Sequence, residues 1–166
     1  MKDDLLNYLK TLKVPDDLVF IPTRVPPTIR SQYALFMQNK LTGEQIARLT
    51  LAINRRENVL KIGGGGTEPS HEGRGIGTFM RAAATKMGAL NGRKRAQQLG
   101  IFTSNRSKQL GVPNSTRILK QLGWRVIKET PNVGFHSEFN YTKNNIGQVN
   151  KVLKNFHRTS MKISNK

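Results

Sequence analysis

Glycines are concentrated in residues 63–77, which read GGGGTEPSHEGRGIG. Glycine weakens both strands and helices, so such a stretch favours a place where the backbone closely approaches another group. Gly73, Gly75 and Gly77 precede or open a helical pattern, and Arg74 adds a positive charge. The first amides of a helix have no intrahelical partner and lie at the positive end of its dipole. The segment therefore predicts a cradle for a phosphate or pyrophosphate.

Two familiar phosphate loops do not fit this segment. A Walker loop requires a lysine directly after its last glycine, and none is present here. A Rossmann loop requires the spacing Gly-x-Gly-x-x-Gly and an acidic residue about 20 positions later. The glycines have another spacing, and residues 73–128 contain no Asp or Glu.

The elements around the loop predict a mixed α/β (α+β) domain with a mostly antiparallel sheet flanked by helices. Apolar residues at helical spacing predict helices over residues 2–13, 76–90, 113–122 and 146–157. Apolar and alternating segments predict strands over residues 19–21, 33–38, 45–54, 99–103, 124–128 and 134–142. A further strand is predicted to begin at residues 59–62 and to run into the glycines. Residues 158–166 are expected to form a mobile basic tail.

Two segments together resemble signatures of the GNAT superfamily of N-acyltransferases. Residues 72–77, EGRGIG, resemble its acyl-CoA loop, Gln/Arg-x-x-Gly-x-Gly/Ala, between a strand and a helix. Residues 114–124 resemble its second signature, a short helix ending in Lys-x-Gly-Phe. The resemblance covers about residues 33–143. Residues 1–32 form a divergent N-terminal helix and extended segment, and residues 144–166 a basic C-terminal helix and tail.

The resemblance implies an N-acetyltransferase that uses acetyl-CoA and an amine acceptor. Amides across residues 73–78 would hold the CoA pyrophosphate, and the strand edge at 65–67 would pair with the pantetheine arm. The implied cofactor-binding residues are Gly66, Thr67, Gly73, Arg74, Gly75, Ile76, Gly77 and Thr78. The four glycines of residues 63–66 further predict that this strand is splayed or bulged.

The catalytic candidates are Glu68, His71 and Tyr141. Glu68 and His71 lie close to the loop, and Tyr141 lies on the last strand. The family usually carries a tyrosine acid on its second helix, where this sequence has Leu119, and Glu72 replaces the usual Gln or Arg. These departures leave an alternative open, namely a catalytically inactive GNAT-fold protein serving as a nucleic-acid-associated or virion assembly component.

The net charge of +18 predicts attraction to polyanions. A nucleic acid or an acidic protein partner is expected to contact the basic residues Arg93, Lys94, Arg95, Lys151, Lys154 and Arg158. A strongly basic enzyme should repel free polyamines. An acceptor on an acidic or nucleic-acid-associated partner would therefore suit it better.

The composition also excludes several kinds of chemistry. With no cysteine, the sequence has no disulfide, thiolate nucleophile or cysteine-ligated zinc, and its three scattered histidines predict no metal cofactor. It has no apolar run of about 18 residues and no apolar segment of a secretory signal. We expect no membrane contact and a cytoplasmic location, or the host cytoplasm or virion for a viral protein.

Overall fold

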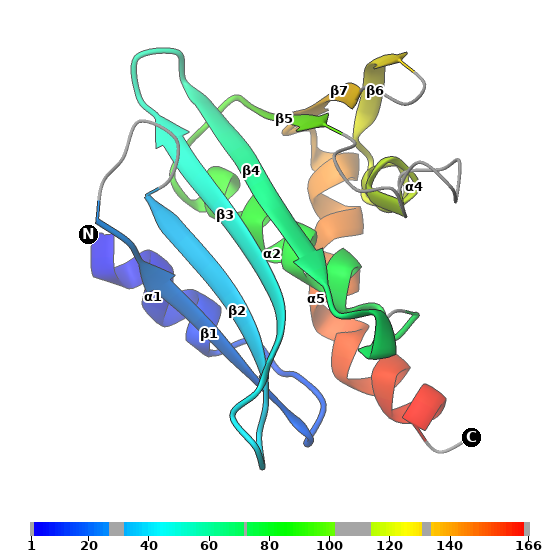
Figure 1. Cartoon of the computed structure of the whole chain (residues 1–166). Helices are drawn as coiled ribbons and strands as arrows, with labels where there is room; N and C mark the ends of the chain where they lie inside the picture. Colours follow the sequence, from blue (N-terminus) through cyan, green and yellow to red (C-terminus); the bar gives the residue numbers. More distant parts are fainter. Residues whose placement is uncertain (1, 27–31, 72, 102–113, 131–133, 165–166) are drawn as a thin grey trace.

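The computed structural model describes residues 2–26, 32–71, 73–101, 114–130 and 134–164 (Figure 1). Its helices are α1 (Lys2–Lys10), α2 (Ile76–Leu90), α4 (Asn114–Gln121) and α5 (Lys143–Ser164), with a short 3-10 turn, η1 (Pro69–His71). Its strands are β1 (Leu18–Arg24), β2 (Tyr33–Asn39), β3 (Gln45–Asn54), β4 (Val59–Thr67), β5 (Arg95–Ile101), β6 (Arg125–Thr130) and β7 (Gly134–Asn140).

The strands form one seven-stranded sheet in the order β1-β2-β3-β4-β5-β7-β6. Neighbouring strands are antiparallel except β4 and β5, which are parallel. Helix α2 connects these two, as a parallel crossover requires. The order of elements along the chain and the mostly antiparallel sheet confirm the predicted fold class.

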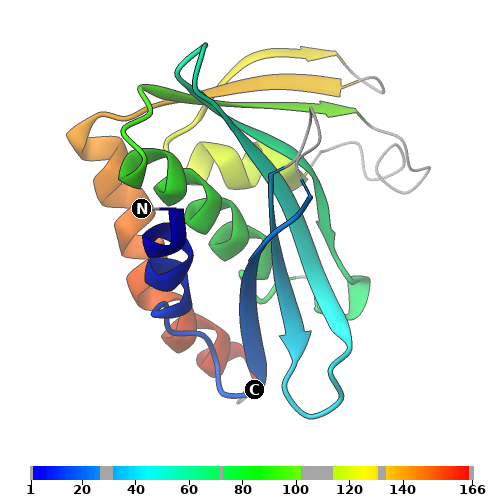
Figure 2. The same ribbon diagram turned by 90° about the vertical axis from the view of Figure 1, so that its left-hand side faces the viewer.

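Helix α2 is the centre of the core. Figure 2 shows the sheet curving around the helices, with α2 between the sheet and α5. Phe79 of α2 stacks on Phe156 of α5 with ring centroids 4.4 Å apart. On its other side, it meets Phe20 of β1 edge-on at 5.0 Å. A helix enclosed in this way must be apolar on more than one face, which explains why the small residues Ala82 and Ala84 are also buried.

The N-terminal segment is built into this core. Leu9 of α1 and Leu18 of β1 belong to the main cluster of buried residues, and β1 pairs with β2 along its whole length. Helix α1 ends at Lys10, earlier than predicted. The Thr11 hydroxyl donates to the Tyr8 carbonyl at 2.6 Å, and such a local side-chain bond competes with continuation of the helix.

Strand β4 begins at Val59 and runs into the glycines as predicted, and it continues to Thr67 because β3 pairs with it there. Two other predictions were wrong. Strand β5 begins at Arg95 rather than at residue 99. Residues 158–164, predicted as a mobile tail, extend α5 to Ser164. Residues 148–164 contain no Gly or Pro that would stop the helix earlier.

Candidate functional site

Strand β4 bulges at its glycines. Gly63 and Gly64 together lie opposite Thr50 of β3, where the register shifts by one residue. The Thr50 hydroxyl donates to the Gly64 carbonyl at 3.2 Å. A Cβ at Gly63 would lie 2.7 Å from that hydroxyl oxygen, and one at Gly65 would lie 2.5 Å from the Arg48 carbonyl oxygen. Side chains at these two positions would collide with β3, so glycine permits the bulge that the sequence predicted.

Beyond the bulge, β4 and β5 separate. Their parallel pairing joins residues 59–62 to residues 95–98 and stops there. Within the described chain, residues 65–67 of β4 pair only with β3, and residues 99–101 of β5 pair only with β7. Figure 1 shows the two strands running apart, with β4 heading towards the start of α2. The backbone edge of β4 that faces the gap is therefore available to an extended ligand.

The strand with the open edge is followed along the chain by η1, the glycine loop and the N-terminus of α2. Gly73 and Gly75 have φ angles of 83° and 81°, in the left-handed region that favours glycine. The first amide to bond back into the helix is that of Phe79, which donates to the Gly75 carbonyl at 2.9 Å. The helical amides before it belong to Ile76, Gly77 and Thr78. No described side chain caps this end, and its first turn has no acidic residue, so these amides can bind an anion.

Side chains from three elements surround Gly77. A Cβ there would lie 3.4 Å from Ile118 of α4, 3.5 Å from Nη1 of Arg81 and 3.6 Å from the Thr67 hydroxyl of β4. Arg81 is 7% exposed, and burial lowers its pKa to about 10, so it remains a cation at neutral pH. Its Nη1 donates to the Gly77 carbonyl at 3.4 Å. The positive charge beneath the helix start was not predicted, because the sequence alone does not show which way Arg81 points.

Arg74 links the glycine loop to the N-terminal segment. Its Nη2 donates to the Asp17 carboxylate at 2.9 Å, and its Nη1 lies 3.3 Å from Nδ1 of His71. The hydrogen bond from Arg74 is the main reason why the pKa of Asp17 is below its ordinary value. No sequence pattern predicts this contact, since the two residues are 57 positions apart in the chain.

Two of the three catalytic candidates lie beside the loop. Glu68 follows the last residue of β4; its side chain is exposed, and its amide donates to the Ile46 carbonyl at 2.7 Å. His71 is half-buried in η1. If its Nδ1 accepts the hydrogen bond from Arg74, the neutral ring carries its proton on Nε2. His71 would then have to break its contact with Arg74 before Nδ1 could take a proton from an amine substrate.

Tyr141 lies elsewhere, against the second half of α2. Its hydroxyl donates to the Thr85 carbonyl at 2.8 Å, and the Trp124 indole donates to the Thr85 hydroxyl at 3.2 Å. A side chain at Gly88 would overlap the Tyr141 hydroxyl. Burial raises the pKa of Tyr141 above its ordinary value of 10.0. With about 1.5 Å of rise per residue, Thr85 lies about 12 Å along the helix from Gly77, so the structure separates this hydroxyl from the loop.

Leu119 occupies the position where the resemblance leads one to expect a tyrosine. It is fully buried in the core on α4. Among the described residues, no group of three or more His, Cys, Asp or Glu side chains could hold a metal ion. No helix in the described ranges is apolar and long enough to cross a membrane.

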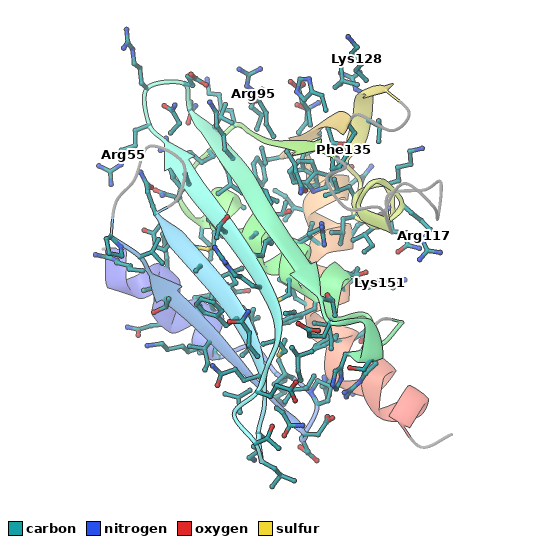
Figure 3. All side chains as sticks on the ribbon, viewed as in Figure 1. Arg55, Arg95, Arg117, Lys128, Phe135 and Lys151 are labelled. Carbon is teal, nitrogen blue, oxygen red and sulfur yellow. The ribbon has the colours of Figure 1, made fainter. Side chains whose placement is uncertain are left out.

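The six basic residues predicted to contact a polyanion lie in two places. Arg93, Lys94 and Arg95 surround the start of β5, where the Arg93 amide donates to the Gly88 carbonyl of α2. Lys151, Lys154 and Arg158 lie along α5. Figure 3 shows Arg95 among the upper strands and Lys151 lower down on α5. A nucleic-acid contact by these residues stays a prediction.

The strand order, the parallel β4–β5 pair and the gap beyond it give this chain the fold of the GNAT N-acetyltransferases. No family model matches the sequence, and no curated protein matches it. The likeness is therefore one of structure.

Three solved structures illustrate it. A GCN5-related N-acetyltransferase from Kribbella flavida is 14% identical, with a TM-score of 0.53 and 70% of this chain and 72% of that one covered. The ribosomal-protein-S5-alanine acetyltransferase from Vibrio fischeri is 14% identical, with a TM-score of 0.52 and 67% of this chain covered; the match spans 62% of that enzyme. A Bacillus subtilis acetyltransferase in complex with CoA is 11% identical, with a TM-score of 0.50 and coverages of 66% and 77%.

Proposed function

We propose that the protein binds acetyl-CoA in the gap between β4 and β5 and transfers its acetyl group to an amine. One observation carries this proposal. The open edge of β4 ends eight residues before a glycine-rich helix N-terminus that no described side chain caps. An acyl-CoA has the matching parts in the same order, since its pantetheine arm carries amides and its pyrophosphate is an anion.

The residues that would hold acetyl-CoA lie on β4, the glycine loop and the start of α2. The edge at Gly66 and Thr67 would pair with the pantetheine amides. The amides of residues 73–78 would hold the pyrophosphate, supported by the positive charge of Arg81 under Gly77. Arg74 is paired with Asp17, so it would help phosphate binding by holding the loop in place. It would contact the phosphates itself only if that ion pair opened.

Bound acetyl-CoA would supply an activated acyl group, and the products would be an amide and the CoA thiol. The protein's own part is to orient the acceptor amine, to accept its proton and to stabilise the developing oxyanion. A backbone amide near the β4 bulge could serve as the oxyanion donor. Glu68 is the proposed base, because its carboxylate is exposed next to the open edge. Tyr141 has no part in this proposal, since its hydroxyl is engaged by Thr85.

The acceptor that suits this chain is an amine on an acidic or nucleic-acid-associated partner. The net charge of +18 supports this choice, because it repels small polycations and attracts polyanions.

Isothermal titration calorimetry with acetyl-CoA tests the proposal, using Gly77→Asp and Gly147→Asp as a matched pair. The first places a carboxylate at the helix start and should weaken binding by at least about tenfold. The second makes the same change at an exposed position on α5 with no atom within 4 Å of the new Cβ, and should bind normally. At 100 times the dissociation constant, the ligand should stabilise the wild type by about 2.7 kcal/mol. Absence of heat and of thermal stabilisation at millimolar acetyl-CoA would overturn the proposal.

A second candidate function is a GNAT-fold protein without catalysis that acts as a nucleic-acid-associated or assembly component. The buried Leu119, in place of a tyrosine acid, is the observation that favours it. In this case acetyl-CoA could still bind, but no CoA thiol would be released with any acceptor. Binding to nucleic acid should weaken steeply as salt increases.

A further inference from the structure

A groove on the helical side of the molecule differs in its chemistry from the glycine loop. It lies between α1 and α5, with α2 behind it, and its volume is about 500 Å³. Figure 2 shows α1 next to α5 on this side. The lining residues are Tyr8, Thr11, Leu12, Lys13, Lys86, Asn150, Leu153, Lys154, His157 and Arg158.

Among the described residues, the lining is basic and contains no carboxylate. Its cations are Lys13, in the segment that follows α1, Lys86 on α2, and Lys154 and Arg158 on α5. Lys86 donates to the Asn150 side chain at 2.8 Å, which joins α2 to α5 beneath the groove. The sequences of α2 and α5 contain no Asp or Glu, so no acid on either helix offsets these charges.

The groove also contains apolar surface. Leu12 and Leu153 contribute to it, with Leu12 half-buried and Leu153 only 4% exposed. A recess with leucines and surrounding cations suits a ligand with an apolar stripe that is flanked by acidic side chains. A nucleic acid backbone would use the cations but would leave the leucines unmatched, because such interfaces are strongly polar.

We propose that the groove between α1 and α5 binds an acidic amphipathic segment of a partner protein. The leucines of this segment would pack on Leu12 and Leu153, and its carboxylates would meet Lys13, Lys154 and Arg158. Lys154 and Arg158 were predicted to contact a nucleic acid or an acidic protein, and this proposal assigns them to the acidic protein. The proposal is independent of acetyl transfer.

Fluorescence anisotropy tests it with a fluorescein-labelled peptide in which pairs of leucines alternate with pairs of glutamates over about three helical turns. Replacing Lys154 and Arg158 by Glu should weaken binding by at least about tenfold, because like charges would face each other. The control replaces Arg55 and Arg56 by Glu, which changes the net charge equally at the exposed β3–β4 turn. This control should change binding by less than about threefold. Circular dichroism melts verify that both variants fold.

A second probe separates a peptide groove from a nucleic-acid site. The same peptide with serines in place of leucines should bind about tenfold more weakly, since it loses its apolar contacts. Equal binding of the two peptides would overturn the proposal. So would an oligothymidylate that displaces the leucine peptide and binds more tightly than it does. No binding of the leucine peptide at about 100 μM in low salt would also overturn it.

Discussion

Arg74 and Asp17 form an ion pair of 2.9 Å between Nη2 and Oδ1, which ties the glycine loop to the segment between α1 and β1. The pair thus joins the segment that follows α1 to the candidate cradle. Asp17 is 52% exposed and Arg74 is 13% exposed, so solvent screens the pair on one side. It therefore positions the loop more than it stabilises the whole fold.

Asp17→Asn should lower the free energy of unfolding by about 0.5 kcal/mol at pH 7. The pKa of Asp17 is lowered in the folded state, mainly by the hydrogen bond from Arg74. The stability that the pair contributes is thus present above the unfolded pKa of about 3.9 and is lost as the pH falls through the lower folded pKa. Urea denaturation from pH 7 down to about pH 2 should show the wild type and Asp17→Asn converging at the acidic end. Asp16→Asn, the same change at the exposed neighbouring position, should have no such effect; a difference between Asp17→Asn and wild type that persists at low pH would contradict the assignment.

Gly65→Ala should destabilise the protein by about 1–3 kcal/mol, because the new Cβ would lie 2.5 Å from the Arg48 carbonyl and force the backbone to move. Gly66→Ala adds the same methyl group at the next position, where no atom lies within 4 Å. Its free energy of unfolding should change by less than about 0.5 kcal/mol. Equal losses in urea denaturation of the two variants would show that the bulge is not what requires glycine.

The sequence predicted the order of the elements well, and for a physical reason. The apolar residues of β3 and α2 follow the periods of a strand and a helix, and both elements have the predicted bounds, Gln45–Asn54 and Ile76–Leu90. The intrinsic preferences of single residues were less informative where pairing between strands decides the secondary structure. Glycine weakens a strand, yet β4 continues through four of them because β3 holds one of its edges.

The candidate site was predictable in part. Its glycine loop is a local pattern, so it could be recognised in the sequence. The Asp17–Arg74 pair and the position of Arg81 depend on contacts between distant segments, which no single-sequence pattern reports. Tyr141 is the clearest example. It was predicted to lie on the last strand, but β7 ends at Asn140 and Tyr141 directly follows it; its partner is Thr85 on α2 rather than any group at the loop.

Glu68→Gln should lower the turnover number by about a hundredfold or more if Glu68 accepts the amine proton, because glutamine cannot take it. The dissociation constant for acetyl-CoA should stay within about twofold, since the proposed contacts to the cofactor are made by the backbone. The measurement is release of the CoA thiol with an acceptor found by screening peptides and amines. Glu44→Gln, at an exposed turn, is the control. Full activity of Glu68→Gln would remove Glu68 from the mechanism and leave His71 to be tested in the same way.

Tyr141→Phe separates a packing role from a catalytic one. Loss of the 2.8 Å hydrogen bond to the Thr85 carbonyl should lower the free energy of unfolding by about 1 kcal/mol. The rate of acetyl transfer, measured at a temperature where both the wild type and the variant are folded, should be unchanged.

The pH dependence of stability gives a second test of the role of Tyr141. Burial raises the pKa of Tyr141 in the folded state, so the neutral phenol contributes stability that is complete below the unfolded pKa of about 10 and is lost as the pH rises beyond it. Denaturation between pH 8 and about pH 11 should therefore show the wild type losing stability relative to Tyr141→Phe. A hundredfold loss of turnover in Tyr141→Phe, with stability unchanged, would instead make the hydroxyl an acid in the reaction and contradict its placement against α2.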